Sequence, residues 1–393
     1  MFELAPIQQA LAEMDLDGWL LCDFRGNNPL ARSVLHFPPG GMASRRWAYF
    51  IPRSGVPRRL VHRIEAAALD HLPGDKTVYL RWQEYEAGLK HLVGSARRVA
   101  MEYSPRNAIP YLARVDAGTI ELVRALGAEP VSSGDLVQLF EACWDDEQWS
   151  LHLEAARYTE AAFHLAWKFL AERVRSETAV TEMQVHDVIM DHFKRHGLTT
   201  YHGPIVAVNA HSGDPHYETS HAPIRAGDLV LIDLWAKMDK PRAVYSDLTW
   251  MGYMGTAVPQ NIAEVFQIVA QARDAGIERV RSAFAQGQIL QGWQVDDATR
   301  AVILAAGYGE AFVHRTGHSI GTEVHGNGAN MDNLETHDER RILPRTCFSI
   351  EPGIYLPEFG IRSEVNVYVD AQGQVHVTGG GPQRHVIPVL AQY

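Results

Sequence analysis

The chain has 393 residues, of which 46% are hydrophobic and 21% are charged, so it can build more than one hydrophobic core. A formal net charge of −11 argues against nucleic acid as the main partner, because phosphate binding requires clustered Lys and Arg side chains. The apolar stretches are interrupted well before membrane-spanning length, so we expect no membrane partner.

The first 145 residues alternate short apolar runs with helical patterns, which predicts an α/β domain. We expect a helix over 113–127 and strands in the runs 18–24, 46–52, 76–82 and 97–103. A long helical pattern then begins at Asp145 or Asp146, either of which is a suitable N-cap. We therefore place a domain boundary there, which gives domains 1–145 and 146–393.

The second domain is expected to be of the α+β class, with helices that cover one face of a sheet. Its first helix presents one apolar face, made by Trp149, Leu153, Ala156, Phe163, Trp167 and Leu170. A second helix is expected between Thr181 as its cap and Gly197 as its end. Two more helices are expected over 261–284 and 294–307.

The three cysteines, Cys22, Cys143 and Cys347, lie far apart in the sequence and form no metal-type CxxC pair. The N-terminal residues carry acids early and lack the basic leader and unbroken apolar core of a secretory signal. Both observations favour a reducing, cytoplasmic location.

Four acids interrupt segments that otherwise have the pattern of strands. Asp233 lies in LVLIDLW, Asp247 in VYSDLTW, Glu351 in CFSIEPGIY and Glu364 in GIRSEVNVYV. Burying so many carboxylates without a counter-ion costs too much free energy. Two divalent cations resolve this conflict, because bridging carboxylates and one imidazole, here that of His318, suit Mn, Co, Zn or Fe(II). A pair of metals can also share and activate one water.

The spacing of the acids predicts two hairpins. Asp233 and Asp247 flank the turn-rich segment KMDKPRA, and Glu351 and Glu364 flank LPEFG, so each pair is expected on two antiparallel strands. Two such hairpins that face each other would form a cage of carboxylates. In the last strand, period-2 alternation separates Val365, Val367 and Val369 from Arg362, Glu364 and Asn366.

The segment HRTGHSIG at 314–321, together with SDLT, EPGIY and GIRSE, resembles the pita-bread metallopeptidases. These include methionine aminopeptidase, aminopeptidase P, prolidase and the related creatinase. The resemblance spans residues 150–393, and the N-terminal domain is similar to that of the creatinase/prolidase branch. It implies an α/β creatinase/prolidase-like domain followed by an α+β pita-bread catalytic domain.

By this resemblance the metal ligands are Asp233, Asp247, His318, Glu351 and Glu364. They are expected to hold two divalent ions, Mn in the first place, with Co, Zn or Fe as alternatives. Asp233 matches the bidentate ligand of one metal, and Asp247 and Glu364 match the bridging ligands. Glu351 matches the ligand that also accepts and returns the proton of the metal-held water.

Four further residues match positions on the substrate side of the family's site. His216, in DPHYE, matches a histidine upstream of the first acid, and His314 matches a pocket histidine. His325 matches the histidine at the scissile carbonyl, where it is expected to stabilise the oxyanion, with His216 as a second candidate for that role. Arg362 matches an arginine that can bind carboxylates through two hydrogen bonds.

The resemblance implies hydrolysis of the Xaa-Pro bond in a small peptide with proline at its second position. Xaa-Pro dipeptidase (prolidase) is the expected activity. Xaa-Pro aminopeptidase (aminopeptidase P) on longer peptides is one alternative, and a creatinase-like reaction on a small molecule is the other. A homodimer is expected, with the N-terminal domain of one chain capping the site of the other.

The chain departs from the family pattern at several positions. Leu234-Trp235 replaces a glycine after the first aspartate, Trp250 replaces an arginine after SDLT, and Gly326 replaces an acid after His325. None of these changes removes a ligand. We expect the two indoles to serve core packing rather than substrate stacking, although they can reshape the pocket.

Overall fold

The computed structural model describes residues 2–38 and 43–393. The chain divides into two compact units, Met1–Glu141 and Ala142–Tyr393. This division and the expected boundary after residue 145 both fall between helices α5 (Gly134–Glu141) and α6 (Asp146–Arg175). Across the described residues we find no helix with the length and apolar character needed to span a bilayer.

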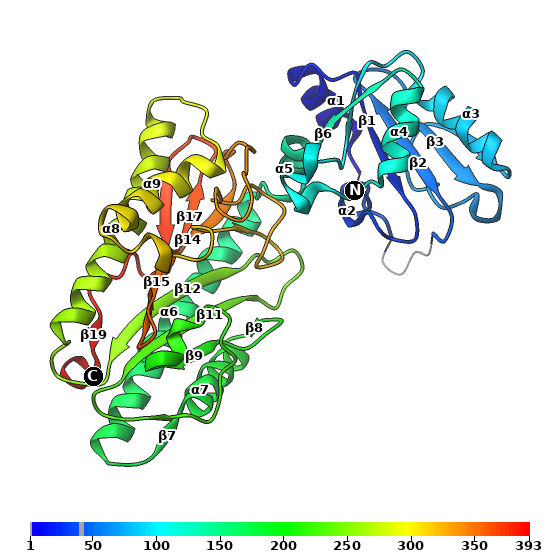
Figure 1. Cartoon of the computed structure of the whole chain (residues 1–393). Helices are drawn as coiled ribbons and strands as arrows, with labels where there is room; N and C mark the ends of the chain where they lie inside the picture. The colour runs from blue at the N-terminus through cyan, green and yellow to red at the C-terminus, as the bar shows by residue number, and fades with distance from the viewer. Residues whose placement is uncertain (1, 39–42) are drawn as a thin grey trace. The chain divides into compact units, whose positions relative to one another are not determined.

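The first unit is built on a sheet with the strand order β4-β3-β2-β1-β5-β6 (Figure 1). Its strands are β1 (Gly18–Asp23), β2 (Trp47–Pro52), β3 (Arg58–His62), β4 (Asp75–Tyr79), β5 (Arg98–Met101) and β6 (Glu129–Ser132). Its remaining helices are α1 (Leu4–Glu13), α2 (Pro29–Val34), α3 (Trp82–Val93) and α4 (Ala117–Ala125).

Helices cover both faces of this sheet, as β1 illustrates. Trp19 and Leu21 pack in one cluster with residues of α1, α2 and α5, whereas Leu20 and Cys22 pack in another with residues of α3 and α4. Such two-sided burial explains why β1 is apolar along its length. The expected strand over 76–82 is wrong at its end, because β4 stops at Tyr79 and α3 begins at residue 82.

The second unit combines a five-stranded sheet, a four-stranded sheet and two two-stranded sheets with two pairs of long helices (Figure 1). The strands that form its main ladders are β9 (Ile205–Val208), β11 (Leu229–Met238), β12 (Ser246–Tyr253), β14 (Cys347–Ile350), β15 (Gly353–Tyr355), β16 (Gly360–Arg362), β17 (Val365–Val369) and β18 (Val375–Thr378). Short strands are β7 (Val180–Thr181), β8 (Leu198–Thr199), β10 (Pro223–Ile224), β13 (Ser319–Ile320) and β19 (Ile387–Pro388). The helices besides α6 are α7 (Glu182–Arg195), α8 (Gln260–Ala285), α9 (Gly292–Ala305) and α10 (Val389–Gln392).

The outer faces of the two sheets are covered by different helices. Ile232 and Leu234 of β11 pack with residues of α6 and α7, and Val365 and Val367 of β17 pack with residues of α8 and α9. On the opposite face of β11 and β12, Leu231 and Met251 pack with residues of α8. Elsewhere on that face, β12 meets β17. A buried bond from the Asp247 amide to the Asn366 Oδ1 atom at 2.9 Å joins them.

The first predicted hairpin is confirmed, because β11 and β12 pair antiparallel with Trp235 opposite Asp247. In the second hairpin, the prediction that Glu351 and Glu364 lie within strands is wrong. Each acid lies in a break between two antiparallel ladders, β14–β17 and β15–β16. At these breaks the Glu351 and Glu364 amides bond to the Thr316 and Thr249 carbonyls, at 2.8 and 3.2 Å respectively.

Helix α6 begins as predicted, with Asp145 as the N-cap that accepts the Gln148 amide. Its buried face differs at one predicted position, because Leu153 is 44% exposed. His152 is buried instead, and its ring bonds to the Tyr245 carbonyl at 2.8 Å and to the Thr378 hydroxyl at 2.7 Å. A polar residue with two buried partners thus takes the place that hydropathy alone assigns to leucine.

Candidate metal centre

Two aspartates project from neighbouring strands of the same hairpin. Asp233 lies on β11 directly opposite Thr249, and Asp247 lies on β12 directly opposite Trp235. Because side chains alternate along a strand, these four residues share one face of the hairpin. Both aspartates are buried, at 8% and 4% exposure.

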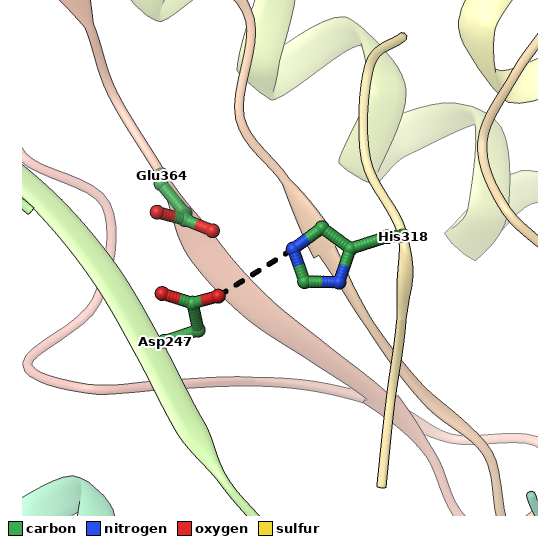
Figure 2. Close-up of side chains that lie close together, drawn as sticks. All are labelled: Asp247, His318 and Glu364. Atoms are coloured by element: carbon green, nitrogen blue, oxygen red, sulfur yellow. Dashed lines mark ion pairs between the residues drawn. The ribbon is translucent and has the colours of Figure 1, made fainter. Parts of the chain in front are cut away.

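Asp247, His318 and Glu364 each offer a ligand atom, and the three atoms lie within 4.8 Å of one another. Figure 2 shows these side chains converging from three segments that are distant in the sequence. The His318 Nε2 atom is 3.4 Å from Asp247 Oδ2 and 3.3 Å from Glu351 Oε1. The structure therefore brings Glu351 to the same imidazole, although Glu351 and Asp233 lie outside the group of three.

The orientation of His318 leaves one ring nitrogen for the acids. Its Nδ1 atom lies 3.2 Å from the Ser319 carbonyl, which can only accept a hydrogen bond. The proton therefore belongs on Nδ1, and the lone pair of Nε2 faces Asp247 and Glu351. Burial lowers the pKa of His318, with Glu351 acting in the opposite direction, so the ring favours the neutral form that binds metals.

The four acids form a cluster that we call the carboxylate cage: Asp233, Asp247, Glu351 and Glu364. Burial raises the pKa of Asp233 to about 6, against the opposing charge of Arg362, and raises the pKa of Asp247 to about 7. Burial also raises the pKa of Glu351 and of Glu364. The protein side chains near the cage therefore supply too little positive charge to neutralise four ionised carboxylates.

Two atoms of the cage have no hydrogen-bond partner in the part of the chain that the structure describes. The Oδ1 atoms of Asp233 and Asp247 are buried without a hydrogen bond among the described residues. Buried carboxylate oxygens of this kind need a cation or a donor. Hard oxygen donors and one neutral imidazole fit Mn, Fe(II), Co or Zn, so these residues fit the expected pair of divalent ions.

Arg362 is the cation that the protein itself supplies. Its Nη2 atom donates to Asp233 Oδ2 at 2.6 Å, its Nη1 to the Tyr355 hydroxyl at 3.0 Å and its Nε to the Thr249 hydroxyl at 3.1 Å. Thr249 in turn donates to Glu364 Oε2 at 2.8 Å. One buried guanidinium thus orients two acids of the cage, leaving one oxygen of Asp233 free.

The three substrate-side histidines occupy different surroundings. His314 is half-buried, and its Nε2 atom lies 2.7 Å from the Tyr355 hydroxyl. The His325 ring stands edge-on to His318, with centroids 4.3 Å apart, and repulsion from His318 together with burial lowers its pKa to about 3. His216 is exposed on the loop before β10, where it also repels the charged form of His325.

The two unusual tryptophans lie on opposite faces of the first hairpin. Trp250 is buried in the core and stacks on Phe163 of α6 with ring centroids 4.7 Å apart. Trp235 lies on the face of Asp233 and stacks with His202, and its Nε1 atom is buried without a partner among the described residues. Trp250 is therefore core packing as predicted. Trp235 is partly buried and also packs against a core cluster, on the face of the hairpin that carries the cage.

At Gly326, where the family has an acid, the structure leaves little space for a side chain. A Cβ atom there would lie 2.9 Å from the Ser319 Oγ atom and 3.1 Å from the Gly321 nitrogen. The Gly326 amide bonds to the Ser319 carbonyl at 2.6 Å, which holds the two segments together. A larger residue would have to displace the segment that carries His318.

Three residues of the site were not predicted as functional from the sequence: Thr249, Ser349 and Tyr355. Ser349 donates from its hydroxyl to Glu351 Oε1 and accepts the His318 amide, both at 3.0 Å. Thr249 and Tyr355 connect to Arg362 as described above. A signal existed for Thr249, because strand alternation places residue 249 on the same side as Asp247.

Comparisons with known proteins place this geometry in context. The model of metallopeptidase family M24 matches residues 150–371. The probable dipeptidase PepE of Mycobacterium bovis is 28% identical over 348 residues, which cover 87% of this chain and 86% of that protein. The Xaa-Pro dipeptidase of Lactobacillus delbrueckii subsp. lactis is 25% identical over 243 residues, 60% of each chain.

The fold is shared with a solved structure over nearly the whole chain. The crystal structure of dipeptidase PepE from Mycobacterium ulcerans superposes with a TM-score of 0.69 at 24% identity, covering 98% of this chain and 96% of that one. The predicted fold class, an α/β domain followed by an α+β pita-bread domain, is confirmed.

Proposed function

The chain belongs to metallopeptidase family M24, and we propose that it hydrolyses the Xaa-Pro bond of dipeptides with the help of two divalent metal ions. The observation that carries this proposal is the carboxylate cage. Two of its buried oxygens have no partner among the described residues, and a neutral imidazole nitrogen faces it. The names of the dipeptidase and Xaa-Pro dipeptidase relatives support the substrate class.

We assign the metal ligands to Asp233, Asp247, His318, Glu351 and Glu364, with Mn as the expected ion. When bound, two such ions supply Lewis acidity and lower the pKa of water. The protein contributes ligands whose orientation is fixed beforehand. Thr249 holds Glu364, Ser349 holds Glu351, and the Ser319 carbonyl sets the tautomer of His318.

Glu351 is the proposed proton carrier. Its Oε1 atom is fixed by the Ser349 hydroxyl, and the carboxylate lies beside the imidazole of His318. It accepts the proton of the attacking water and delivers it to the leaving imino nitrogen of proline, a secondary amine. Protonation of this nitrogen is necessary, because without the proton it would have to leave as a strongly basic amide anion, whereas with the proton it leaves as a neutral amine.

His325 and His216 are the proposed donors to the oxyanion that forms at the scissile carbonyl. The pKa of His325 is lowered to about 3, so its ring is neutral near pH 7 and offers one N–H group. His314, through Tyr355, and Arg362 form a connected wall that we assign to substrate binding.

A panel of peptides tests the substrate assignment. Protein loaded with Mn or Co is incubated with Xaa-Pro dipeptides and with Xaa-Pro-Yaa tripeptides, and the released amino acids are quantified. We expect cleavage of the dipeptides. Cleavage of the tripeptides alone would replace the dipeptidase assignment with an aminopeptidase. Two bound metals without cleavage of either series would favour a small-molecule reaction.

Two glutamates of one hairpin provide a matched pair for the catalytic assignment. Glu351→Gln is expected to abolish turnover while the protein remains folded, because the amide cannot accept the proton. Glu358→Gln, in the exposed turn between β15 and β16, is the control and is expected to leave turnover unchanged. Equal turnover in the two variants would remove Glu351 from the mechanism.

Elemental analysis after purification without added metal measures the native ion and its stoichiometry, with two ions per chain expected. We also propose a homodimer and a cytoplasmic location. The three cysteines, all within the described residues, are unpaired, which supports a reducing environment. Sedimentation equilibrium tests the dimer, and a monomer at micromolar concentration would reject it.

A further inference from the structure

Residues 312–318 carry two of the site histidines and form neither a helix nor a strand. His314 and His318 lie on this segment, which runs from the end of a short 3-10 turn to the start of β13. Its backbone groups therefore need partners from elsewhere in the fold. Those partners determine where the two imidazoles point.

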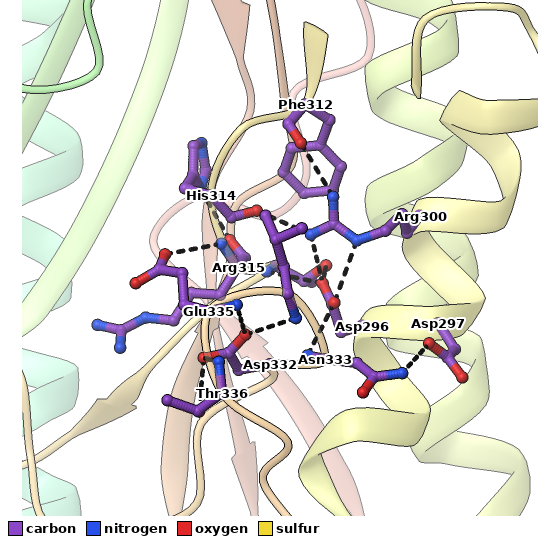
Figure 3. Close-up of polar contacts among 12 residues, drawn as sticks. Asp296, Asp297, Arg300, Phe312, His314, Arg315, Asp332, Asn333, Glu335 and Thr336 are labelled. Atoms are coloured by element: carbon purple, nitrogen blue, oxygen red, sulfur yellow. Dashed lines mark hydrogen bonds and ion pairs between the residues drawn. The ribbon is translucent and has the colours of Figure 1, made fainter. Parts of the chain in front are cut away.

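Asp296 of α9 supplies the first set of partners. Its side chain is fully buried, and its Oδ1 atom accepts the Thr316 amide at 3.0 Å and the Thr316 hydroxyl at 2.6 Å. Its Oδ2 atom accepts the Asn333 amide at 2.9 Å. One carboxylate thus fixes the middle of the histidine segment and a second loop at once, as Figure 3 shows.

Arg300, one helical turn further along α9, supplies the second set. It pairs with Asp296 at 3.0 Å, and its remaining N–H groups donate to the Phe312 carbonyl at 3.0 Å and the His314 carbonyl at 2.8 Å. The guanidinium also lies over the Phe312 ring, 4.1 Å from its centroid. The ion pair therefore binds the segment at residues 312, 314 and 316.

A third attachment comes from the loop that follows. The Arg315 amide donates to Glu335 Oε1 at 3.2 Å, and the turn that carries Glu335 is wound around Asp332. Asp332 accepts the amides of Leu334, Glu335 and Thr336. This attachment is linked to the ion pair, because Asp296 also accepts the Asn333 amide of the same turn (Figure 3).

The position of Thr316 is passed on directly to the cage. The Thr316 carbonyl accepts the Glu351 amide at 2.8 Å, and the His318 carbonyl accepts the Ser349 amide at 2.9 Å. A shift of Thr316 therefore moves His318 and Glu351 together. The two side chains meet at 3.3 Å, where displacements of a few tenths of an ångström matter for a shared metal.

We propose that Asp296 and Arg300 form a positioning pair that holds His314 and His318 in register with the carboxylate cage. This role rests on the proposed metal function of the cage, but it is separate from the choice of substrate. A buried ion pair gains little net stability over apolar residues, so its hydrogen bonds to the segment are its main contribution. Neither residue is among the proposed metal ligands or the proposed substrate-side residues.

The next residue on the helix provides a matched control. Asp297 is exposed, and its Oδ1 atom accepts only from the Asn333 side-chain amide at 2.7 Å among the contacts of the described residues. Asp296→Asn and Asp297→Asn make the same chemical change on adjacent residues that both contact Asn333. Only the first change reaches Thr316.

The readout is the affinity of the purified, metal-free protein for Mn²⁺ and Co²⁺, measured by isothermal titration calorimetry. Asp296→Asn is expected to weaken binding by about tenfold, the lower end for residues that orient metal ligands. Asp297→Asn is expected to change it by less than about twofold. Circular dichroism and thermal unfolding verify that both variants are folded.

A milder pair of variants keeps the test decisive if Asp296→Asn fails to fold. Thr316→Val retains the amide bond to Asp296 but loses the hydroxyl bond, so we expect about threefold weaker metal binding. Thr316→Ser restores the hydroxyl and is expected to restore the affinity. Wild-type affinity in folded Asp296→Asn or Thr316→Val protein would overturn the proposal.

A second readout needs neither metal nor activity. In metal-free protein labelled with ¹⁵N-histidine, Asp296→Asn is expected to shift the ring resonances of His314 and His318, whereas Asp297→Asn leaves them unchanged. Unchanged resonances in Asp296→Asn would also overturn the proposal. A wild-type protein that binds two metals but cleaves no Xaa-Pro peptide would reject the proposed substrate and leave this positioning role intact.

Discussion

Substitution by alanine should destabilise the protein at one of the two glycines that flank the candidate metal histidine and have little effect at the other. In the sequence Gly317-His318-Ser319-Ile320-Gly321 they lie at the two ends of the motif. A Cβ atom on Gly317 would lie 2.0 Å from the Ser349 carbonyl oxygen and 2.7 Å from its carbon. A Cβ atom on Gly321 would have the Gly326 Cα at 3.8 Å as its nearest neighbour, which is ordinary contact.

The cost of Gly317→Ala follows from these distances. Relief of the clash requires a movement of about 1 Å between the segment and β14, and overpacking of this kind costs roughly 1–3 kcal/mol. The same movement disrupts the bonds from the Ser349 and Glu351 amides, now 2.9 and 2.8 Å long. Each is worth roughly 0.5–1.5 kcal/mol, so we expect a total loss of about 2–6 kcal/mol in the free energy of unfolding.

Urea unfolding of the metal-free proteins, followed by circular dichroism, measures this difference. Gly321→Ala is expected to change the free energy of unfolding by less than about 1 kcal/mol, because its φ angle is not in the left-handed range and the space is open. Gly317→Ala should also weaken metal binding, since His318 moves with its neighbour. Coincident unfolding curves for the two variants would refute this reasoning.

Three further predictions concern other parts of the second unit. Thr249→Val removes the hydroxyl that bonds to both Arg362 and Glu364, so the free energy of unfolding in urea should fall by about 1–3 kcal/mol. Thr249→Ser keeps a hydroxyl and should largely avoid this loss. Trp250→Phe loses no hydrogen bond and should cost roughly 1–2 kcal/mol in unfolding without changing the KM for Xaa-Pro peptides, whereas Trp235→Ala should change that KM. Burial lowers the pKa of His152 from 6.5 to about 4, so the unfolded chain binds the proton first as the pH falls. Stability should therefore decrease by about 3 kcal/mol between pH 6.5 and pH 4, a decrease that His152→Gln removes in pH-dependent unfolding.

Local patterns were sufficient for much of the fold. Alternation and a turn-rich segment predicted the β11–β12 hairpin, and Asp145 and Thr181 cap their helices as expected. The failures occurred where a tertiary partner overrides the local pattern. Glu351 and Glu364 leave their strands because their amides bond to segments far away in the sequence.

The candidate metal ligands could be predicted from the sequence, because metal ions of this kind bind only a few types of side chain, mainly carboxylates and imidazoles. Acids within apolar strands are rare, and their cost when buried points to a cation. The residues that hold those ligands carry no such restriction. Thr249 and Ser349 use ordinary hydroxyl hydrogen bonds, which only the folded chain identifies as part of the site.

Asp296 and Asp297 of α9 show when a residue that holds the ligands can still be recognised from the sequence. Asp296 lies on the buried stripe of the helix with Val295, Thr299 and Ile303, whereas Asp297 lies outside it. Helical periodicity alone therefore distinguishes the two residues. A carboxylate on a buried stripe must find donors, and Asp296 finds them in the amides of two irregular segments, at Thr316 and Asn333. In this chain the segment that bonds to Asp296 through Thr316 also carries His314 and His318. An acid on the buried stripe of a helix, such as Asp296 on α9, can therefore indicate from the sequence that a nearby irregular segment is held in place.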